Sequence, residues 1–419
     1  DLNFMKLNIY LSIFITLNLA SCSISKPVNY SIEDSKNSLH PQFLIYHNNE
    51  SRSQLFFQVA TEDVLYSRAT INQPFSAKIL LEYIVFQKDH KEIIDSGSIL
   101  ITDQYLKNKK ARIDTNFIFN FSKSEEGFLD LRISDINRSR EFRKTLSIDK
   151  FSESSRQFYM ITDTNNQILF DDFFFEGQSI LIKSHFNNDK LYATKNKTVF
   201  PLSPPPFTKS AQPSFPDNIS FTEELNFNSQ NIIFYDLPNE GFVFFQLDTL
   251  NDLGFTLFNF HNDYPLLKSA EQLIPPLRYL TTKDEFDLLV SSINPKVAVD
   301  KYWLSNATSK ERARTLIRVF YSRVEFANKL FSCHLEGWKT DRGMISIIFG
   351  TPSYTSLVRN SEVWIYGDEN NIHSLKFVFD QKPNPFSSND YVLSRNYSYK
   401  NPWYRAVESW RNGKVYLLK

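Results

Sequence analysis

Hydrophobic and polar residues alternate in short runs between residues 43 and 148, as in the segment Lys78-Ile79-Leu80-Leu81-Glu82-Tyr83-Ile84-Val85. Polar turns such as Asp95-Ser96-Gly97 separate these runs. A period of two predicts strands with one buried face. About seven such strands predict an antiparallel β-sandwich over residues 41–150. The predicted strands are 43–46, 54–59, 77–86, 97–102, 111–121, 127–133 and 143–148.

A second β-rich domain is predicted over residues 151–262. Its predicted strands are 157–162, 168–175, 179–183, 198–202, 231–235, 241–247 and 253–259. A proline-rich segment, 201–216, interrupts them. Proline lacks a backbone donor and fixes φ, so this segment is predicted to be an extended loop. We favour a rigid surface loop over a PxxP recognition ligand.

Beyond Tyr264 the apolar spacing becomes helical, starting with Leu266, Ala270, Leu273 and Leu277. Thr282 and Glu285 form a capping-box pattern before a helix over 286–290, and Thr308 and Glu311 repeat it before a longer helix. That helix carries one apolar stripe, made of Leu316, Ile317, Phe320, Val324, Ala327 and Phe331.

Five cations of the longer helix are expected largely outside its stripe: Arg312, Arg314, Arg318, Arg323 and Lys329. We interpret them as a solvated face, with an anion-binding surface as the alternative. Strands are predicted again at 344–349, 362–366, 374–380 and 391–395. Helices followed by a small antiparallel sheet predict an α+β domain over 263–419. The predicted fold class is therefore multidomain: two antiparallel β-sandwich-like domains followed by a C-terminal α+β domain.

Charge and composition narrow the functional classes. The chain has 419 residues, with 47 Lys and Arg against 47 Asp and Glu, so it has no basic field that would attract nucleic acid. Aromatic residues make up 15% of the chain, which excludes a disordered protein.

The N-terminal segment predicts export and lipidation. Met5-Lys6 precedes an apolar run over 9–20 that is too short to span a bilayer stably, and Leu19-Ala20-Ser21-Cys22 resembles the bacterial lipobox. The resemblance implies a signal peptide over 1–21 and acyl chains of the palmitate type on Cys22. The polar residues of mixed charge that follow predict a tether over 22–40. Three acyl chains hold a protein at a membrane almost permanently. Because Ser23 follows the cysteine and no Asp does, we expect the outer membrane, with the protein facing the periplasm.

A further resemblance lies after the longer helix, in Gly337-Trp338-Lys339-Thr340-Asp341-Arg342-Gly343. This segment resembles the signature of the GWxTD-domain family of bacterial envelope proteins. Gly350-x-Pro352 and Trp364-x-Tyr366 match the family as well. The resemblance covers about residues 263–419 and implies an exported, commonly lipid-anchored protein with no known catalytic residues.

Two interpretations of this signature remain open. As a structural corner, Gly337 would permit a turn, Trp338 would be buried, and Asp341 would accept backbone donors while pairing with Arg342 or a helix arginine. Gly343 would then let the chain enter a strand close to a neighbour. As a binding site, the Trp338 face, Thr340, Asp341 and Arg342 would converge on a ligand. We favour the corner.

No catalytic or metal motif is found in the sequence. The pair Cys333-His334 is expected to be a plain buried cysteine beside a histidine, since adjacent side chains generally point apart. With Cys22 lipidated, Cys333 has no intrachain disulfide partner. We expect no metal and no cofactor apart from the lipid on Cys22.

The leading hypothesis is a non-enzymatic outer-membrane lipoprotein that acts as a protein-interaction subunit of an envelope assembly or secretion complex. Its expected partners are the membrane and other envelope proteins, an outer-membrane β-barrel complex being one candidate. The alternative is a periplasmic hydrolase or glycan-binding protein, with Trp338, Trp364 and Trp403 as sugar platforms and Asp341 as acid or base. A third hypothesis, a lipid-handling scaffold, requires an apolar cavity.

Overall fold

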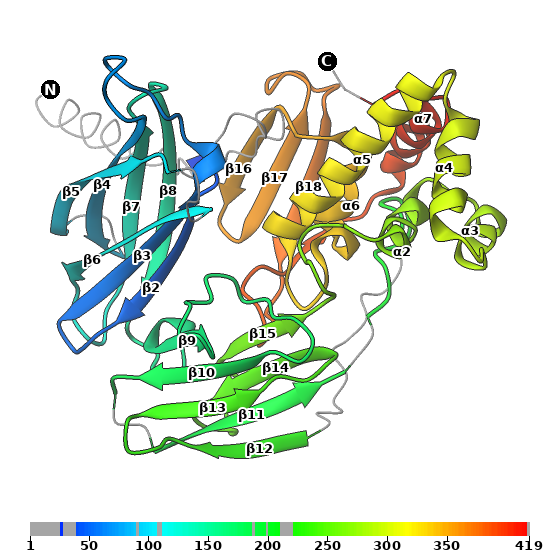
Figure 1. Ribbon diagram of the computed structural model, residues 1–419. Coiled ribbons are helices and arrows are strands. Elements are labelled where there is room, and N and C mark those ends of the chain that lie inside the picture. Colours follow the sequence, from blue (N-terminus) through cyan, green and yellow to red (C-terminus); the bar gives the residue numbers. More distant parts are fainter. Residues whose placement is uncertain are drawn as a thin grey trace, which may run out of the picture.

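The structure is a computed structural model that describes residues 26–27, 39–88, 92–106, 111–186, 189–197, 200–209 and 221–416. The predicted signal peptide, Cys22 and most of the predicted tether lie outside these residues. Two separate sheet regions precede a mixed region of helices and strands (Figure 1). Within the described ranges, no helix combines the length and the apolar character needed to cross a membrane.

The first domain is a sandwich of two antiparallel sheets, with strand orders β2-β3-β6 and β5-β4-β7-β8. Leu55, Phe57, Leu81, Phe119 and Leu129 lie between the sheets and are at most 1% exposed. Each of the seven predicted strands is confirmed. Their bounds are β2 (Gln42–His47), β3 (Arg52–Ala60), β4 (Ser76–Gln87), β5 (Ile93–Gln104), β6 (Arg112–Asn120), β7 (Glu126–Asp135) and β8 (Arg140–Asp149).

The second domain also consists of two antiparallel sheets, ordered β13-β10-β9 and β12-β11-β14-β15. Their bounds are β9 (Tyr159–Asp163), β10 (Ser179–Ser184), β11 (Lys190–Asn196), β12 (Phe221–Asn226), β13 (Ile232–Asp236), β14 (Gly241–Gln246) and β15 (Phe255–Asn259). The sequence missed β11 and β12 because their lysines, glutamates and asparagines dilute the alternation.

Two predicted strands of this domain are wrong. Segment 168–175 forms only isolated bridges, one of them between Phe173 and Phe258 of β15, although Phe174 beside it is buried. In the predicted strand 198–202, the described residues 200–202 have no regular structure. In segment 168–175 the apolar run therefore indicates a partly buried segment and not a strand.

The C-terminal domain packs helices against a sheet of order β1-β16-β17-β18-β19 (Figure 1). Its helices are α2 (Ala270–Leu273), α3 (Lys283–Val290), α4 (Pro295–Asn306), α5 (Lys310–Phe331), α6 (Asp341–Phe349) and α7 (Lys400–Arg411), with short 3-10 turns η3 (Pro275–Tyr279), η4 (Gly337–Lys339) and η5 (Tyr397–Tyr399). Its strands are β16 (Tyr354–Val358), β17 (Ser361–Tyr366), β18 (Leu375–Gln381), β19 (Tyr391–Leu393) and the two-residue β1 (Lys26–Pro27), which pairs with β16. The predicted α+β class is confirmed.

The predicted strand 344–349 is instead most of helix α6. Every residue of α6 is buried, so it has no polar face to reveal a helical period. A short apolar run of this kind fits a buried strand and a buried helix equally well.

Helix capping and the cations of α5 also differ in part from the prediction. The Thr282–Glu285 capping box is present, but Ser309 caps α5 in place of Thr308. Arg323 is 4% exposed, against the expectation of a solvated face. Its Nη1 donates to the Ile347 carbonyl at 3.0 Å, near the C-terminal end of α6, where a cation is favourable.

Candidate functional site

The signature residues 337–343, which we call the signature corner, bring three backbones into contact. A Cβ on Gly337 would lie 2.0 Å from the Ala327 carbonyl oxygen of α5. A Cβ on Gly343 would lie 1.9 Å from the Gly337 carbonyl oxygen. Both positions therefore require glycine because any side chain would separate α5, η4 and α6. Gly343 serves this contact inside a helix, and not the strand entry that the sequence suggested.

Thr340 begins α6. Its hydroxyl accepts from the Gly343 amide at 3.0 Å and donates to the Gly337 carbonyl at 2.8 Å. Thr340 is thus both the N-cap of α6 and the closure of the η4 turn, which explains the need for a hydroxyl at this position.

Asp341 connects α6 to the end of β19 and to the residues just after it. Its Oδ2 accepts from the Leu393 amide at 2.8 Å and from Arg395 Nη1 at 2.9 Å, and its Oδ1 accepts from Arg395 Nη2. The prediction that Asp341 pairs with Arg342 or a helix arginine is wrong. Nothing in the local sequence pointed to Arg395, because the pair forms only when β19 packs against α6.

Arg342 lies between the rings of Phe331 and Tyr391, at 5.0 and 4.2 Å from their centroids. Its Nη1 donates to Glu362 Oε2 at 2.9 Å, and its Nη2 donates to the Asn389 carbonyl at 2.9 Å. The other oxygen of Glu362 accepts from Trp364 Nε1 at 2.8 Å. Arg342 and Trp364 are therefore joined through one buried carboxylate.

The tryptophans proposed as sugar platforms are not accessible. Trp338, Trp364 and Trp403 are 6%, 0% and 5% exposed. Trp338 donates through Nε1 to Glu336 at 3.1 Å and through its amide to Asn328 Oδ1 at 3.0 Å. A sugar ring stacks on an open aromatic face, which none of these side chains offers. The geometry thus favours the structural corner over a binding site made of the signature residues themselves.

The signature corner nevertheless contacts a segment from another domain. Residues 200–209, which we call the strap, belong to the connection between β11 and β12 of the second domain. They lie on the C-terminal domain. Arg395 Nη2, held by Asp341, also donates to the Pro204 carbonyl at 3.2 Å. Beside the strap is an open groove of about 650 Å³, lined by Leu202, Pro204, Pro205, Tyr279, Trp403 and Tyr404 among others. The signature corner therefore orients a guanidinium that binds polypeptide backbone.

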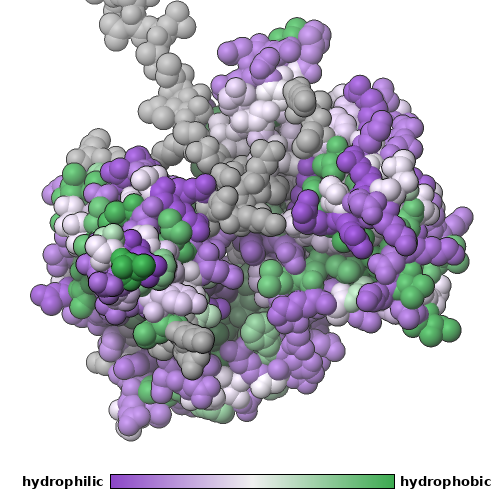
Figure 2. All heavy atoms as spheres, turned by 45° about the horizontal axis from the view of Figure 1, so that its top comes forward, coloured by the Kyte–Doolittle hydropathy of each residue, from purple (hydrophilic) through white to green (hydrophobic). Residues whose placement is uncertain are grey.

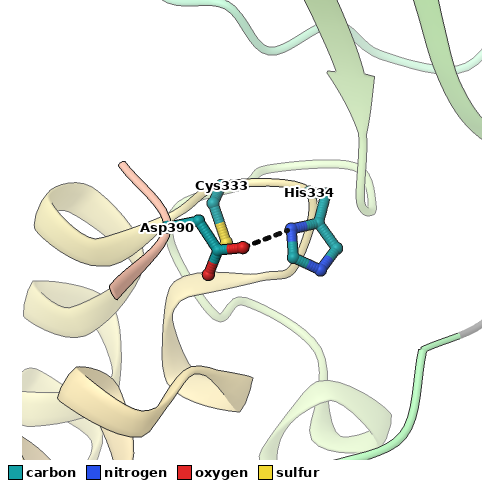
Figure 3. A group of neighbouring side chains, drawn as sticks. All are labelled: Cys333, His334 and Asp390. Atoms are coloured by element: carbon teal, nitrogen blue, oxygen red, sulfur yellow. Dashed lines mark ion pairs between the residues drawn. The ribbon is translucent and has the colours of Figure 1, made fainter. Parts of the chain in front are cut away.

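A cluster of potential metal ligands lies nearby. Cys333 Sγ, a ring nitrogen of His334 and a carboxylate oxygen of Asp390 all lie within 4.8 Å of one another (Figure 3). The sequence did not connect Asp390 with the Cys333-His334 pair. The Asn384 amide nitrogen contacts His334 Nδ1 at 2.8 Å and Asp390 Oδ2 at 3.0 Å, and its oxygen accepts from the Phe386 amide. The Asn384 amide thus occupies the Nδ1 lone pair of His334 and one oxygen of Asp390.

Burial controls the ionisation of this cluster. It raises the pKa of the Cys333 thiol to about 12 and lowers the pKa of His334 to about 4. Burial also raises the pKa of Asp390. A nucleophilic thiol needs a lowered pKa, and burial shifts the Cys333 thiol the opposite way.

An apolar surface lies at the far end of the helices. Leu288, Val290, Ile293 and Val297, which belong to α3, α4 and the turn between them, are between 58% and 104% exposed. Hydrophobic side chains are visible at this end of the molecule, at the right edge of Figure 2. Exposed apolar residues grouped in this way are typical of protein contact surfaces.

These features define a multidomain protein in which two antiparallel β-domains precede an α+β domain built around the signature corner. The sequence model of the GWxTD domain family matches residues 241–412. The chain therefore carries a GWxTD domain, which confirms the resemblance found in the sequence.

No curated protein matches the chain. Among solved structures, a glycosyl hydrolase family 2 (GH2) member from Bacteroides cellulosilyticus DSM 14838 is similar at 10% sequence identity and a TM-score of 0.19. The match covers 31% of this chain and 16% of that one. Similarity at this level carries no argument about function.

Proposed function

We propose that this protein is a lipid-anchored, non-enzymatic subunit of an envelope assembly or secretion complex, in which the GWxTD domain makes protein contacts. The observation that carries the proposal is the contact between Arg395 and the Pro204 carbonyl. Through it, a side chain organised by the GWxTD signature binds main chain from another part of the polypeptide. Main-chain recognition is a general basis of protein–protein contact.

The membrane anchor is part of the same proposal. The lipobox-like segment Leu19-Ala20-Ser21-Cys22 supports lipidation of Cys22, and the residues after it support the outer membrane and a periplasmic orientation. Replacement of Cys22 by Ser tests this directly. The variant is expected in the aqueous fraction, whereas the unmodified chain should stay with the membrane. Recovery of both from the membrane would contradict lipid anchoring.

The burial of the signature corner supports a non-enzymatic role. The Thr340 hydroxyl, the Asp341 carboxylate and the terminal nitrogens of Arg342 all bond within the domain, and each residue is at most 7% exposed. A carboxylate fixed by a guanidinium and a backbone amide is poorly placed to transfer a proton to a bound substrate.

The decisive experiment is affinity purification of the full chain from detergent-solubilised native membranes, under conditions that preserve known complexes. We expect stoichiometric partner proteins to be recovered. The purified chain should also show no turnover of peptidoglycan or glycan fragments at millimolar concentration. Recovery of the protein alone, or turnover of a glycan, would contradict the proposal.

A further inference from the structure

The strap belongs to an unusually long connection between two neighbouring strands. β11 and β12 are paired antiparallel, and Lys195 lies opposite Phe221. Strands paired in this way are usually joined by two to five residues. Here residues 197–220 intervene, and the strap within them lies on the C-terminal domain. Connections of this length in compact domains usually have a function of their own.

Hydrogen bonds to its main chain hold the strap at three points. The Ser203 amide donates to the Lys339 carbonyl at 3.3 Å, and the Asn396 amide donates to the Pro206 carbonyl at 3.3 Å. The third is the bond from Arg395 to the Pro204 carbonyl. Consecutive prolines offer carbonyl oxygens without amide donors, and the GWxTD domain presents two donors at this place. The chemistry of the two surfaces is therefore complementary.

Apolar contacts add side-chain selectivity. Leu202 and Phe207 pack against the core of the C-terminal domain, and Pro206 between them is buried. The Phe207 ring lies 5.5 Å from the ring of Tyr404. Proline next to aromatic side chains, with its carbonyls bound by donors, is how proline-rich segments are recognised in general.

The strap is held in a way that permits exchange. Pro201, Pro205 and Lys209 are exposed, so only part of the segment is enclosed. The strap contributes no strand to any sheet, and its release would leave the pairing of β11 with β12 intact. The open groove beside it, with the 54% exposed Tyr404 on its wall, leaves room for incoming chain.

We propose that the GWxTD domain of this chain is a receptor for extended proline-containing polypeptide segments, and that the strap is a built-in ligand which such a segment from a partner protein replaces. Asp341 acts as a positioning residue because it holds Arg395 toward the bound carbonyl. This inference rests on the proposed function, because it specifies which kind of partner the protein-interaction subunit binds.

The test measures binding of a labelled synthetic peptide, Phe200 to Lys209 of this sequence, by fluorescence anisotropy. The receptor is the full chain in detergent, with residues 201–207 replaced by glycine and serine. We expect saturable binding, at least about tenfold tighter than to the unmodified chain, because a tethered ligand competes at an effective concentration on the order of millimolar. A peptide with alanine at Pro204, Pro205 and Pro206 should bind at least about tenfold more weakly.

A matched pair of surface variants locates the site. Tyr404 is 54% exposed and contacts Phe207, whereas Tyr397 is 69% exposed and does not line the groove. In the strap-replaced chain, Tyr404→Ala should weaken peptide binding by about fivefold or more, and Tyr397→Ala should leave it unchanged. Equal effects of the two substitutions would overturn the assignment of the groove.

A second measurement needs no altered chain. Millimolar peptide added to the unmodified protein should raise hydrogen exchange at the Ser203 amide, because displacement of the strap breaks its bond to the Lys339 carbonyl. The proposal would be overturned if a strap-replaced chain with native tryptophan fluorescence showed no saturable binding. Unchanged hydrogen exchange in the unmodified chain would overturn it as well. If the peptide bound but affinity purification from membranes recovered no partner, the receptor proposal would stand and the proposed function as an interaction subunit would be contradicted.

Discussion

The carboxylate of Asp341 and the guanidinium of Arg395 form a two-pronged ion pair whose side chains are only 2% and 8% exposed. The same carboxylate binds the amide of Leu393 at 2.8 Å, so α6 and the end of β19 share one acceptor. Arg395 in turn reaches the strap. A single acidic residue of the signature therefore couples the helix, the sheet and a segment from the preceding domain.

Replacement of Asp341 should destabilise the C-terminal domain strongly. Asp341→Asn leaves Arg395 buried without its charge partner, and breaking such a pair costs about 3–5 kcal/mol. Tryptophan fluorescence during urea unfolding reports on this domain alone, because all five tryptophans lie in it: Trp303, Trp338, Trp364, Trp403 and Trp410.

The pair Glu285–Arg411 provides a matched control in the same domain. Its side chains are 39% and 33% exposed, and Arg411 Nη1 lies 2.7 Å from Glu285 Oε2. Glu285→Gln should cost less than about 1 kcal/mol, since solvent screens an open pair. If both substitutions lowered the unfolding free energy equally, the burial argument for Asp341 would fail.

Gly343→Ala should prevent normal packing of the signature corner. The new Cβ would lie 1.9 Å from the Gly337 carbonyl oxygen, and backbone cannot yield as a flexible side chain can. We expect a loss of about 3 kcal/mol or more, at the upper end of single-substitution effects. The measurement is the midpoint of the tryptophan transition in urea.

Gly177→Ala is the comparison for that experiment. Gly177 has a φ of +70°, and an added Cβ would meet no heavy atom within 4 Å, so only backbone strain opposes alanine. The expected cost is about 1 kcal/mol and falls on the second domain. Because that domain contains no tryptophan, the tryptophan transition of Gly177→Ala should stay unchanged. An unchanged tryptophan transition in Gly343→Ala would contradict the close approach of η4 and α6.

The pattern of alternation was enough to predict the first domain, because each of its strands has one face in the core. It failed at the uniformly buried helix α6, whose apolar run resembles a strand, and at β11, a central strand with several polar residues. In α6 all residues are buried, and the helix is set by the Thr340 cap and by packing, neither of which alters the apolar run. In β11 the lysines at both ends hide the inward-facing Leu191 and Ala193.

The candidate site, too, could be predicted from the sequence only in part. The signature itself could be found from the sequence, including the expectation that Trp338 is buried. Its partners could not, because Glu362, Asn389 and Arg395 lie far along the chain in segments without a distinctive pattern. The strap was visible only as a run of prolines, and its position on the GWxTD domain depends on contacts between domains.

Cys333 should be unreactive in the folded protein. Burial raises the pKa of its thiol to about 12, so at pH 8 only about one molecule in ten thousand carries a thiolate. Iodoacetamide should therefore label Cys333 of a Cys22→Ser chain very slowly in buffer and rapidly in urea, as measured by mass spectrometry. Fast labelling of the folded chain would show that the Cys333 cluster is open to solvent.

His334 should make the C-terminal domain sensitive to acid over a defined range. Its Nδ1 faces the amide of Asn384 at 2.8 Å, and burial lowers its pKa from 6.5 to about 4. The unfolded chain therefore takes up this proton first as the pH falls. Stability is lost between about pH 6.5 and pH 4, by ~3 kcal/mol at most for a shift of this size, and no further loss comes from His334 below that range.

His334→Gln provides the comparison because it keeps an acceptor for Asn384 and removes the titration. Asp390 beside it acts in the opposite direction. Burial raises the pKa of this carboxyl, so the folded state gains its proton before the unfolded state does, and part of the acid loss is offset. The tryptophan-monitored free energy of unfolding should thus fall more steeply from pH 6.5 to pH 4 in the unmodified chain than in His334→Gln. Parallel curves for the two chains would mean that His334 is protonated equally in both states, and hence that the cluster is not enclosed in solution.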